Sequence, residues 1–355
     1  MLDSTKTVIL QLYLVESCLS ANMDGAVEYG VLGYSTDNIG DDIQSIASSR
    51  FLPSIDQVIN RERLHRFDGP RTKVILNAFF LDSPKHFPPS DRIDPLLISM
   101  HVTPVMRKGF IKRSKEYLIE HGPVGCRDMT TLRWLEENDV PAYFSGCLTT
   151  TLMSNPEIEK QDYIIATDLP DEVVEYMRSE ADCPVYTLSH DFRPVFDMRT
   201  RLEAAKVFLY LYNSARCVVS RRLHASVPSL AMGTPSLLLD IDLERFGGRF
   251  EGVREHVRQM SVEDFLDGKY DINSPPPNPT SHMKIRNDLV KRCAEFTGYD
   301  SGRSSVTVPK IPEIMWMLRN NENDHRRMFY KYWKKEALEM FFDKYIRGRR
   351  AEDMD

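Results

Sequence analysis

The region between Val218 and Asp240 constrains the fold of this chain more than any other part of its 355 residues. Its pattern predicts, in order, an apolar strand, a basic tip, a helix of small residues, a Gly-Pro turn and a second apolar strand: Val218–Ser220, Arg221–His224, Ala225–Met232, Gly233–Pro235 and Ser236–Asp240. This order is typical of a βαβ unit, which belongs to a parallel sheet. Ligands of such sheets bind at the carboxyl ends of the strands, where the next helix offers free N–H groups to anions.

The basic tip itself indicates the chemistry of the ligand. Arg221 and Arg222 at a strand end predict an anion, either a phosphate or a carboxylate. His224 beside them can move a proton near neutral pH. The alternative is that each arginine pairs with a neighbouring aspartate or caps the carboxyl end of a helix.

A second arginine-tipped strand is expected upstream. Within Pro123–Asp128, a short strand is predicted to end in Arg127, and Asp128 is a suitable N-cap for a helix over Met129–Asn138. The next segment, from Val140 to Thr149, predicts a strand followed by a loop of small residues. We therefore expect Arg127 at a strand tip that faces Arg222, with the same pairing alternative.

A third loop lies near the start of the chain. Tyr29–Tyr34 predicts a strand, Ser35–Asp42 a polar turn, and Ile43–Ser49 a short helix. Asp41 and its neighbour Asp42 are either the first residues of that helix or acids that point into a cleft. The glycine before them lets the backbone approach a ligand closely.

The rest of the chain alternates in the same way, which predicts an α/β protein with parallel sheets. Further strands are expected over 72–79, 95–102, 162–167 and 184–188, and further helices over 107–121, 171–181 and 199–214. Asn155-Pro156 interrupts the pattern within 153–160, and Ser274–Pro279 is a stiff loop or linker. The predicted domains are therefore 1–155 and 156–310, followed by a tail over 311–355.

Composition excludes several classes of protein. The net charge of −6 argues against a general nucleic-acid binder. Six single cysteines without a C-x-x-C pair give no support to a zinc or thiol-redox site, and they suit a reducing, cytoplasmic setting. No stretch is long enough to span a bilayer, and Val8–Val15 predicts a buried strand or helix rather than a signal peptide.

In the tail, His325–Arg350 is basic with aromatic residues three and four apart, which predicts a helix packed across the domains. The alternative is a helix lying on an anionic membrane.

Several of these stretches together resemble the polysaccharide pyruvyl transferase family. The resemblance runs from about residue 29 to about residue 250 and is carried, in order, by Asn38–Gln44, Leu97–His101, Val124–Asp128, Tyr143–Thr149, Arg222–Ala225 and Ala231–Pro235. One departure falls on the acceptor side. Where the family has Asn-Gly-Trp, this chain has Asn77-Ala78-Phe79.

The resemblance implies a fold and a reaction. The fold is two Rossmann-like domains facing each other across a cleft (glycosyltransferase-B-like), with the acceptor in the N-terminal domain, the donor in the second and a C-terminal helical tail. The reaction moves the enolpyruvyl unit of phosphoenolpyruvate onto sugar hydroxyls to form a pyruvate ketal, without a metal or other cofactor. The enzyme would be cytoplasmic, with peripheral membrane contact only if the tail helix lies on a membrane. The acceptor stays open between nucleotide-linked, lipid-linked and polymeric sugars.

The residues fit that chemistry, because the donor carries two anionic groups and needs a proton at its methylene carbon. We assign His224 and Asp41 to catalysis. Substrate binding is assigned to Asn38, His101, Arg127, Arg222 and Leu223. Two alternatives are a nucleotide-sugar glycosyltransferase of the same architecture and a non-catalytic sugar-binding relative.

Overall fold

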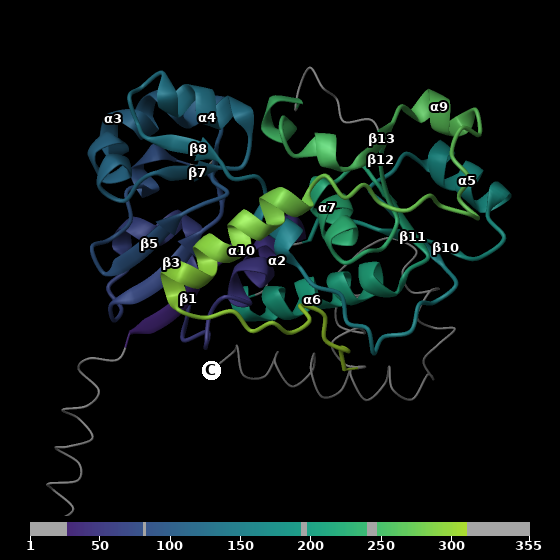
Figure 1. Cartoon of the computed structure of the whole chain (residues 1–355), viewed down its shortest axis with the longest axis horizontal. Helices are drawn as coiled ribbons and strands as arrows, with labels where there is room; N and C mark the ends of the chain where they lie inside the picture. Colours follow the sequence, from purple (N-terminus) through teal and green to yellow (C-terminus); the bar gives the residue numbers. More distant parts are fainter. Residues whose placement is uncertain (1–26, 81–82, 193–196, 240–246, 311–355) are drawn as a thin grey trace, which may run out of the picture.

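The computed structural model describes residues 27–80, 83–192, 197–239 and 247–310 of the chain. Two parallel sheets organise it (Figure 1). The first sheet has the order β2 (Gln57–Asn60), β1 (Glu28–Gly33), β3 (Thr72–Leu76) and β5 (Ile93–Leu97). The second has the order β10 (Val185–Leu188), β9 (Ile164–Thr167), β11 (Cys217–Ser220), β12 (Ser236–Leu239) and β13 (Arg258–Met260). The predicted α/β class with parallel sheets is confirmed.

Two small parallel pairs stand beside the first sheet. They are β4 (Phe79–Phe80) with β6 (His101–Val102), and β7 (Val124–Cys126) with β8 (Ala142–Phe144). The sequence predicted unbroken strands over 72–79 and 95–102, and both are interrupted. Asn77 leaves the first sheet and donates its side-chain amide to the carbonyl oxygen of Gln44 at 2.8 Å. Ser99 has a φ of 52°, which a strand cannot continue.

Helices connect and cover the strands. They are α2 (Ile39–Ser49), α3 (Pro104–Glu120), α4 (Met129–Glu136), α5 (Asp171–Glu180), α6 (Met198–Ser214), α7 (Leu223–Ala231), α9 (Val262–Leu266) and α10 (Met283–Thr297). Short 3₁₀ turns are η1 (Arg61–Arg66), η2 (Pro84–His86), η3 (Leu148–Thr151), η4 (Gly247–Phe250) and η5 (Arg254–His256). Asp128 caps α4 as predicted, accepting the N–H of Thr131 at 2.9 Å.

One continuous hydrophobic core joins the two sheets. Val31 of β1, Ile43 of α2, Phe208 of α6 and Val218 of β11 are all fully buried within it. Strands such as β9, β11 and β12 are buried along their whole length, as parallel strands covered on both faces are.

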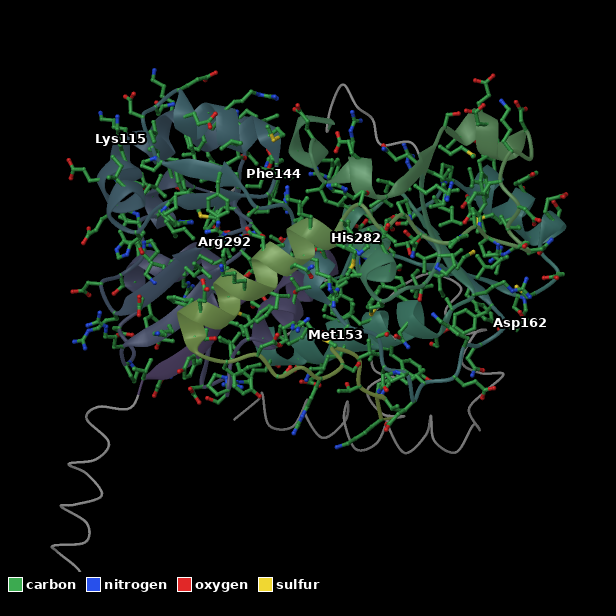
Figure 2. All side chains as sticks on the ribbon, in the orientation of Figure 1. Lys115, Phe144, Met153, Asp162, His282 and Arg292 are labelled. Atoms are coloured by element: carbon green, nitrogen blue, oxygen red, sulfur yellow. The ribbon has the colours of Figure 1, made fainter. Side chains whose placement is uncertain are left out.

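The helix α10 fastens the two halves from outside and has no counterpart among the sequence predictions. It crosses the front of the molecule from the side of β1 toward α7 (Figure 1). Lys73 of the first sheet donates to the Phe296 carbonyl oxygen at 2.8 Å, and Arg286 donates to the carbonyl oxygen of Thr150 at 2.7 Å. Arg292 of α10, labelled in Figure 2, lies over the Tyr143 ring, 4.2 Å from its centroid. The predicted second domain, 156–310, includes this helix, yet α10 also packs on the first sheet. The domain limits therefore stay predictions.

Two other predicted segments, Val8–Val15 and the tail over 311–355, lie outside the described residues. Among the described helices, none combines the length and apolar character that crossing a membrane requires.

Candidate functional site

The carboxyl ends of three adjacent strands bring polar side chains together in the second sheet. Asp168 follows β9, His190 and Asp191 follow β10, and Arg222 follows β11. Because β9 lies between β10 and β11, these residues meet at one sheet edge. Arg222 donates through Nε to Asp168 at 2.6 Å and through a terminal nitrogen to Asp191 at 2.9 Å.

The pairing alternative therefore holds for Arg222, whose charge is already balanced by two carboxylates. Its side chain is one-third exposed, and its backbone forms the N-cap of α7, which begins two residues earlier than predicted. Whether Arg222 contacts the donor stays a prediction.

The first turn of α2 lies directly against this edge. Helix α2 begins at Ile39 rather than at Ile43, so Asp41 is within its first turn. Asn38 is its N-cap, accepting the Gly40 N–H at 3.0 Å, and the Ile39 N–H donates to the His190 carbonyl oxygen at 2.9 Å.

Gly40 makes this approach possible. A Cβ added there would lie 3.1 Å from Nδ1 of His190 and 3.1 Å from Cβ of His224. The sequence predicted that this glycine gives room to a ligand. In the structure, the missing Cβ lets the helix pack against the two histidines.

Arg127 reaches the same place from the end of β7. It is 2% exposed, and a terminal nitrogen of its guanidinium donates to the side-chain oxygen of Gln44 at 3.3 Å. Its Nε is buried without an acceptor, and its guanidinium lies 5.6 Å from the Phe79 ring centroid.

Arg127 differs from the other buried arginines of the described residues. Arg50 pairs with Asp300 at 2.9 Å, Arg61 with Glu62 at 2.5 Å, and Arg201 with Asp42 at 2.7 Å. No carboxylate of the described chain lies within 4.0 Å of Arg127. A buried cation without a counter-ion is costly. Such a cation therefore marks a place where an external anion is expected to bind.

His224 is buried beside Arg127. Its Nε2 lies 3.7 Å from the Sγ atom of Cys147. Burial, followed by the charges of Arg127, His190 and Arg249, holds the pKa of His224 well below its usual range. Burial is the largest of these causes. His224 is therefore neutral in the unliganded site.

Asp41 is buried in the first turn of α2 and lines the same recess. It accepts from the Thr36 hydroxyl at 2.9 Å and lies 3.7 Å from a terminal nitrogen of Arg61. Burial raises its pKa despite the positive charge of Arg61. Asp42 points elsewhere, into the fully buried pair with Arg201.

His101 takes a supporting position. Its Nδ1 lies 2.5 Å from the Asp128 carboxylate, and its ring stacks on Phe79 with centroids 4.8 Å apart. Burial lowers the pKa of His101 to about 4. Phe79 rather than His101 faces the recess described next.

These groups surround a small recess, about 60 Å³ in volume, that is open to solvent. The lining combines residues from both halves of the fold: Asn38, Asp41, Phe79, Arg127, His190, Arg221, Arg222, Leu223, His224, Arg249 and Phe250. All assigned site residues except His101 are brought together here. Phe79, His190, Arg249 and Phe250 were not assigned from the sequence. Two of them had a signal: His190 follows a predicted strand and precedes an aspartate, and Phe79 stands where the family has the Trp of Asn-Gly-Trp.

His190 is held by two contacts. Its Nε2 lies 2.8 Å from the Tyr212 hydroxyl, and its backbone N–H donates to Asp168 at 2.9 Å. Burial lowers its pKa to about 4. Within the described residues, no group of three or more His, Cys, Asp or Glu side chains is placed to hold a metal ion.

Comparison with protein families identifies the chain. The model of the family "Polysaccharide pyruvyl transferase" matches residues 38–242, more than half of the sequence. The chain belongs to the polysaccharide pyruvyl transferase family. The match begins at Asn38 and includes Asp41, Arg127, Arg222 and His224, whereas Arg249 lies beyond it.

Other comparisons add little to the family match. None of the curated proteins matches the sequence. A solved structure of a functionally uncharacterised protein from Klebsiella pneumoniae is 10% identical, covering 74% of this chain and 99% of its own, with a TM-score of 0.37.

Proposed function

We propose that this pyruvyl transferase family member moves the enolpyruvyl unit of phosphoenolpyruvate onto two hydroxyls of a sugar, forming a pyruvate ketal. The acceptor is a unit of a polysaccharide or its precursor. The observation that carries the proposal is Arg127, a buried arginine without a carboxylate partner among the described residues, which lines the same solvent-open recess as the neutral His224.

The charges of the recess support an anionic donor. Arg127 and Arg249 both lie within 6 Å of the Phe79 ring, at 5.6 Å and 5.7 Å from its centroid. Each lowers the pKa of His224, and Arg127 also lowers that of Arg249, so their positive charges act on the same space. Phosphoenolpyruvate brings a phosphate and a carboxylate that would balance them.

The proposed reaction begins with a proton. Its transfer to the methylene carbon makes a methyl group and leaves positive charge at C2. A sugar hydroxyl attacks C2 and loses its proton. The bond between C2 and the bridging phosphate oxygen then breaks, and phosphate leaves with the bonding pair. The second hydroxyl attacks C2, loses its proton and closes the ketal. One hydroxyl proton thus ends on the methyl carbon and the other on phosphate.

His224 and Asp41 take the two polar roles in this scheme. The anionic donor would raise the pKa of His224, and the imidazolium then protonates the methylene carbon. Asp41, which also lines the recess, orients the attacking hydroxyl. Developing charge at C2 forms next to the donor carboxylate, which the arginines hold in place.

The test is phosphate release from phosphoenolpyruvate by the full chain, with a panel of sugar acceptors and mass analysis of the product. We expect acceptor-dependent phosphate release and a product carrying one pyruvate ketal. Arg127→Met should abolish turnover at low donor concentration. Arg303→Met, which changes an exposed arginine, should match wild type.

Two outcomes would refute the proposal. Turnover of a nucleotide-linked sugar without any reaction of phosphoenolpyruvate would select a glycosyltransferase. Binding of a sugar with no turnover of either donor would select a sugar-binding protein.

A further inference from the structure

An exposed basic surface lies on α3 and the two 3₁₀ turns beside it. We name it the α3 basic face, and it consists of Arg63, Arg66, Lys85, Lys108, Lys112 and Arg113. All six side chains are exposed. Within the described part of the chain, none of them makes an ion pair.

Contacts between the three elements make this surface continuous. The rings of His65 in η1 and His86 in η2 stack with centroids 5.4 Å apart. The charges of Arg66 and Arg113 both lower the pKa of His65, so η1 and α3 are electrostatic neighbours. At Gly109 of α3, an added Cβ would lie 2.7 Å from the Pro84 side chain of η2.

The charge of this face opposes that of the whole chain. Helix α3 carries five lysines and arginines against two glutamates, whereas α5 carries four carboxylates and one arginine. The net charge of the chain is −6. Lys115, which pairs with Asp139 at 3.3 Å, lies at the outer edge of the molecule, where α3 faces away from the centre (Figure 2).

Apolar side chains accompany the cations on the same face of α3. Val105 is 89% exposed and Ile119 is 45% exposed. Val105, Lys108, Lys112 and Ile119 follow at spacings of three, four and seven residues, which places them along one side of the helix. This side of α3 therefore presents both cations and apolar side chains to the outside, which are the two kinds of group that a bilayer surface with anionic headgroups can bind.

We propose that the α3 basic face docks this protein on a bilayer that contains anionic phospholipid. Unpaired cations gain energy from a negatively charged surface, and the exposed valine and isoleucine gain by entering the headgroup boundary. A soluble polyanion would use the cations alone and would leave both apolar side chains in water. The proposal therefore favours the bilayer, and it is independent of the proposed reaction.

The experiment measures sedimentation of the full chain with vesicles of phosphatidylcholine, alone or mixed with phosphatidylglycerol. The test variant is Lys108→Gln/Lys112→Gln/Arg113→Gln. The matched control, Lys269→Gln/Lys284→Gln/Lys291→Gln, removes three exposed cations elsewhere. Thermal melting verifies that both variants are folded.

We expect wild type and control to bind the mixed vesicles and to release in high salt. Each lost cation should lower the partition coefficient about fivefold, so the test variant should bind about a hundredfold more weakly. Failure of wild type to bind, equal loss in the control, or unchanged binding of the test variant would each overturn the proposal. Binding of dextran sulfate but not of vesicles would assign the face to a soluble polyanion instead.

Discussion

Replacing Arg127 with methionine should separate ligand binding from folding. In most buried ion pairs, removal of the arginine leaves a carboxylate buried without a partner and destabilises the protein. Arg127 has no such partner among the described residues. Its removal gives up a hydrogen bond to Gln44 of about 1.5–3 kcal/mol and a contact with the Phe79 ring of about 1 kcal/mol. It also relieves a desolvation penalty of several kcal/mol.

These contributions nearly cancel or favour the variant. We therefore expect the free energy of unfolding of Arg127→Met to be unchanged or to rise by up to about 2 kcal/mol. Its affinity for phosphoenolpyruvate should fall by about 2–5 kcal/mol, or roughly thirtyfold to several thousandfold. Thermal melting and calorimetric titration of the donor measure the two quantities on one preparation.

Arg222→Met is the matched control, because this arginine does have carboxylate partners. Its removal leaves Asp168, which is 15% exposed, without its 2.6 Å ion pair, and the free energy of unfolding should fall by about 1–3 kcal/mol. A lower melting temperature for Arg127→Met with unchanged donor affinity would refute the reasoning. The buried cation would then serve the fold and not a ligand.

Three further predictions concern the histidines and the buried ion pair. His224→Gln should lower turnover by about 10²–10⁴-fold while the donor dissociation constant, measured by calorimetry, stays within about threefold. Loss of donor affinity with normal turnover at saturation would instead make His224 a phosphate ligand only. Burial lowers the pKa of His190 to about 4, so its contribution to stability is full above about pH 6.5 and is lost as the pH falls toward 4. Melting temperatures should therefore fall less between about pH 7 and about pH 4.5 in His190→Gln than in wild type, and an equal fall would show that this side chain is not the cause. Asp42→Asn should lower the free energy of unfolding in a urea titration by about 3–5 kcal/mol, because Arg201 stays buried without its carboxylate, and a loss under about 1 kcal/mol would contradict this.

Local signals in the sequence were enough to predict much of the fold and the general place of the site. The apolar runs of β9, β11 and β12 are strands because both of their faces are buried, and a continuous apolar run is a direct sign of that. Asp128 was recognised as an N-cap from its position before a helical pattern. Arg127 and Arg222 were expected at strand tips that face each other, and both line the recess although β7 and β11 belong to different sheets.

The electrostatic partners could not be predicted, since they depend on contacts between distant segments. Arg222 meets Asp168 and Asp191, which are 54 and 31 residues away in the sequence. The sequence around Arg127 looks equally capable of pairing, yet its tip faces Gln44 and Phe79. Which arginine keeps an unbalanced charge is therefore a property of the tertiary structure.

The protonation states of Asp41 and His224 connect the positive charge of Arg127 to the proposed reaction. In the unliganded site, Asp41 has a raised pKa and His224 a lowered one, so both side chains disfavour their charged forms. Positive charge therefore rests with the arginines, and His224 holds no acidic proton to lose. Arrival of a doubly anionic donor would oppose the effect of Arg127 on His224 and raise its pKa. On this reasoning the acid forms only when the molecule it must protonate is bound, so an isolated carboxylate or phosphate alone should raise the pKa of His224 less than the intact donor does.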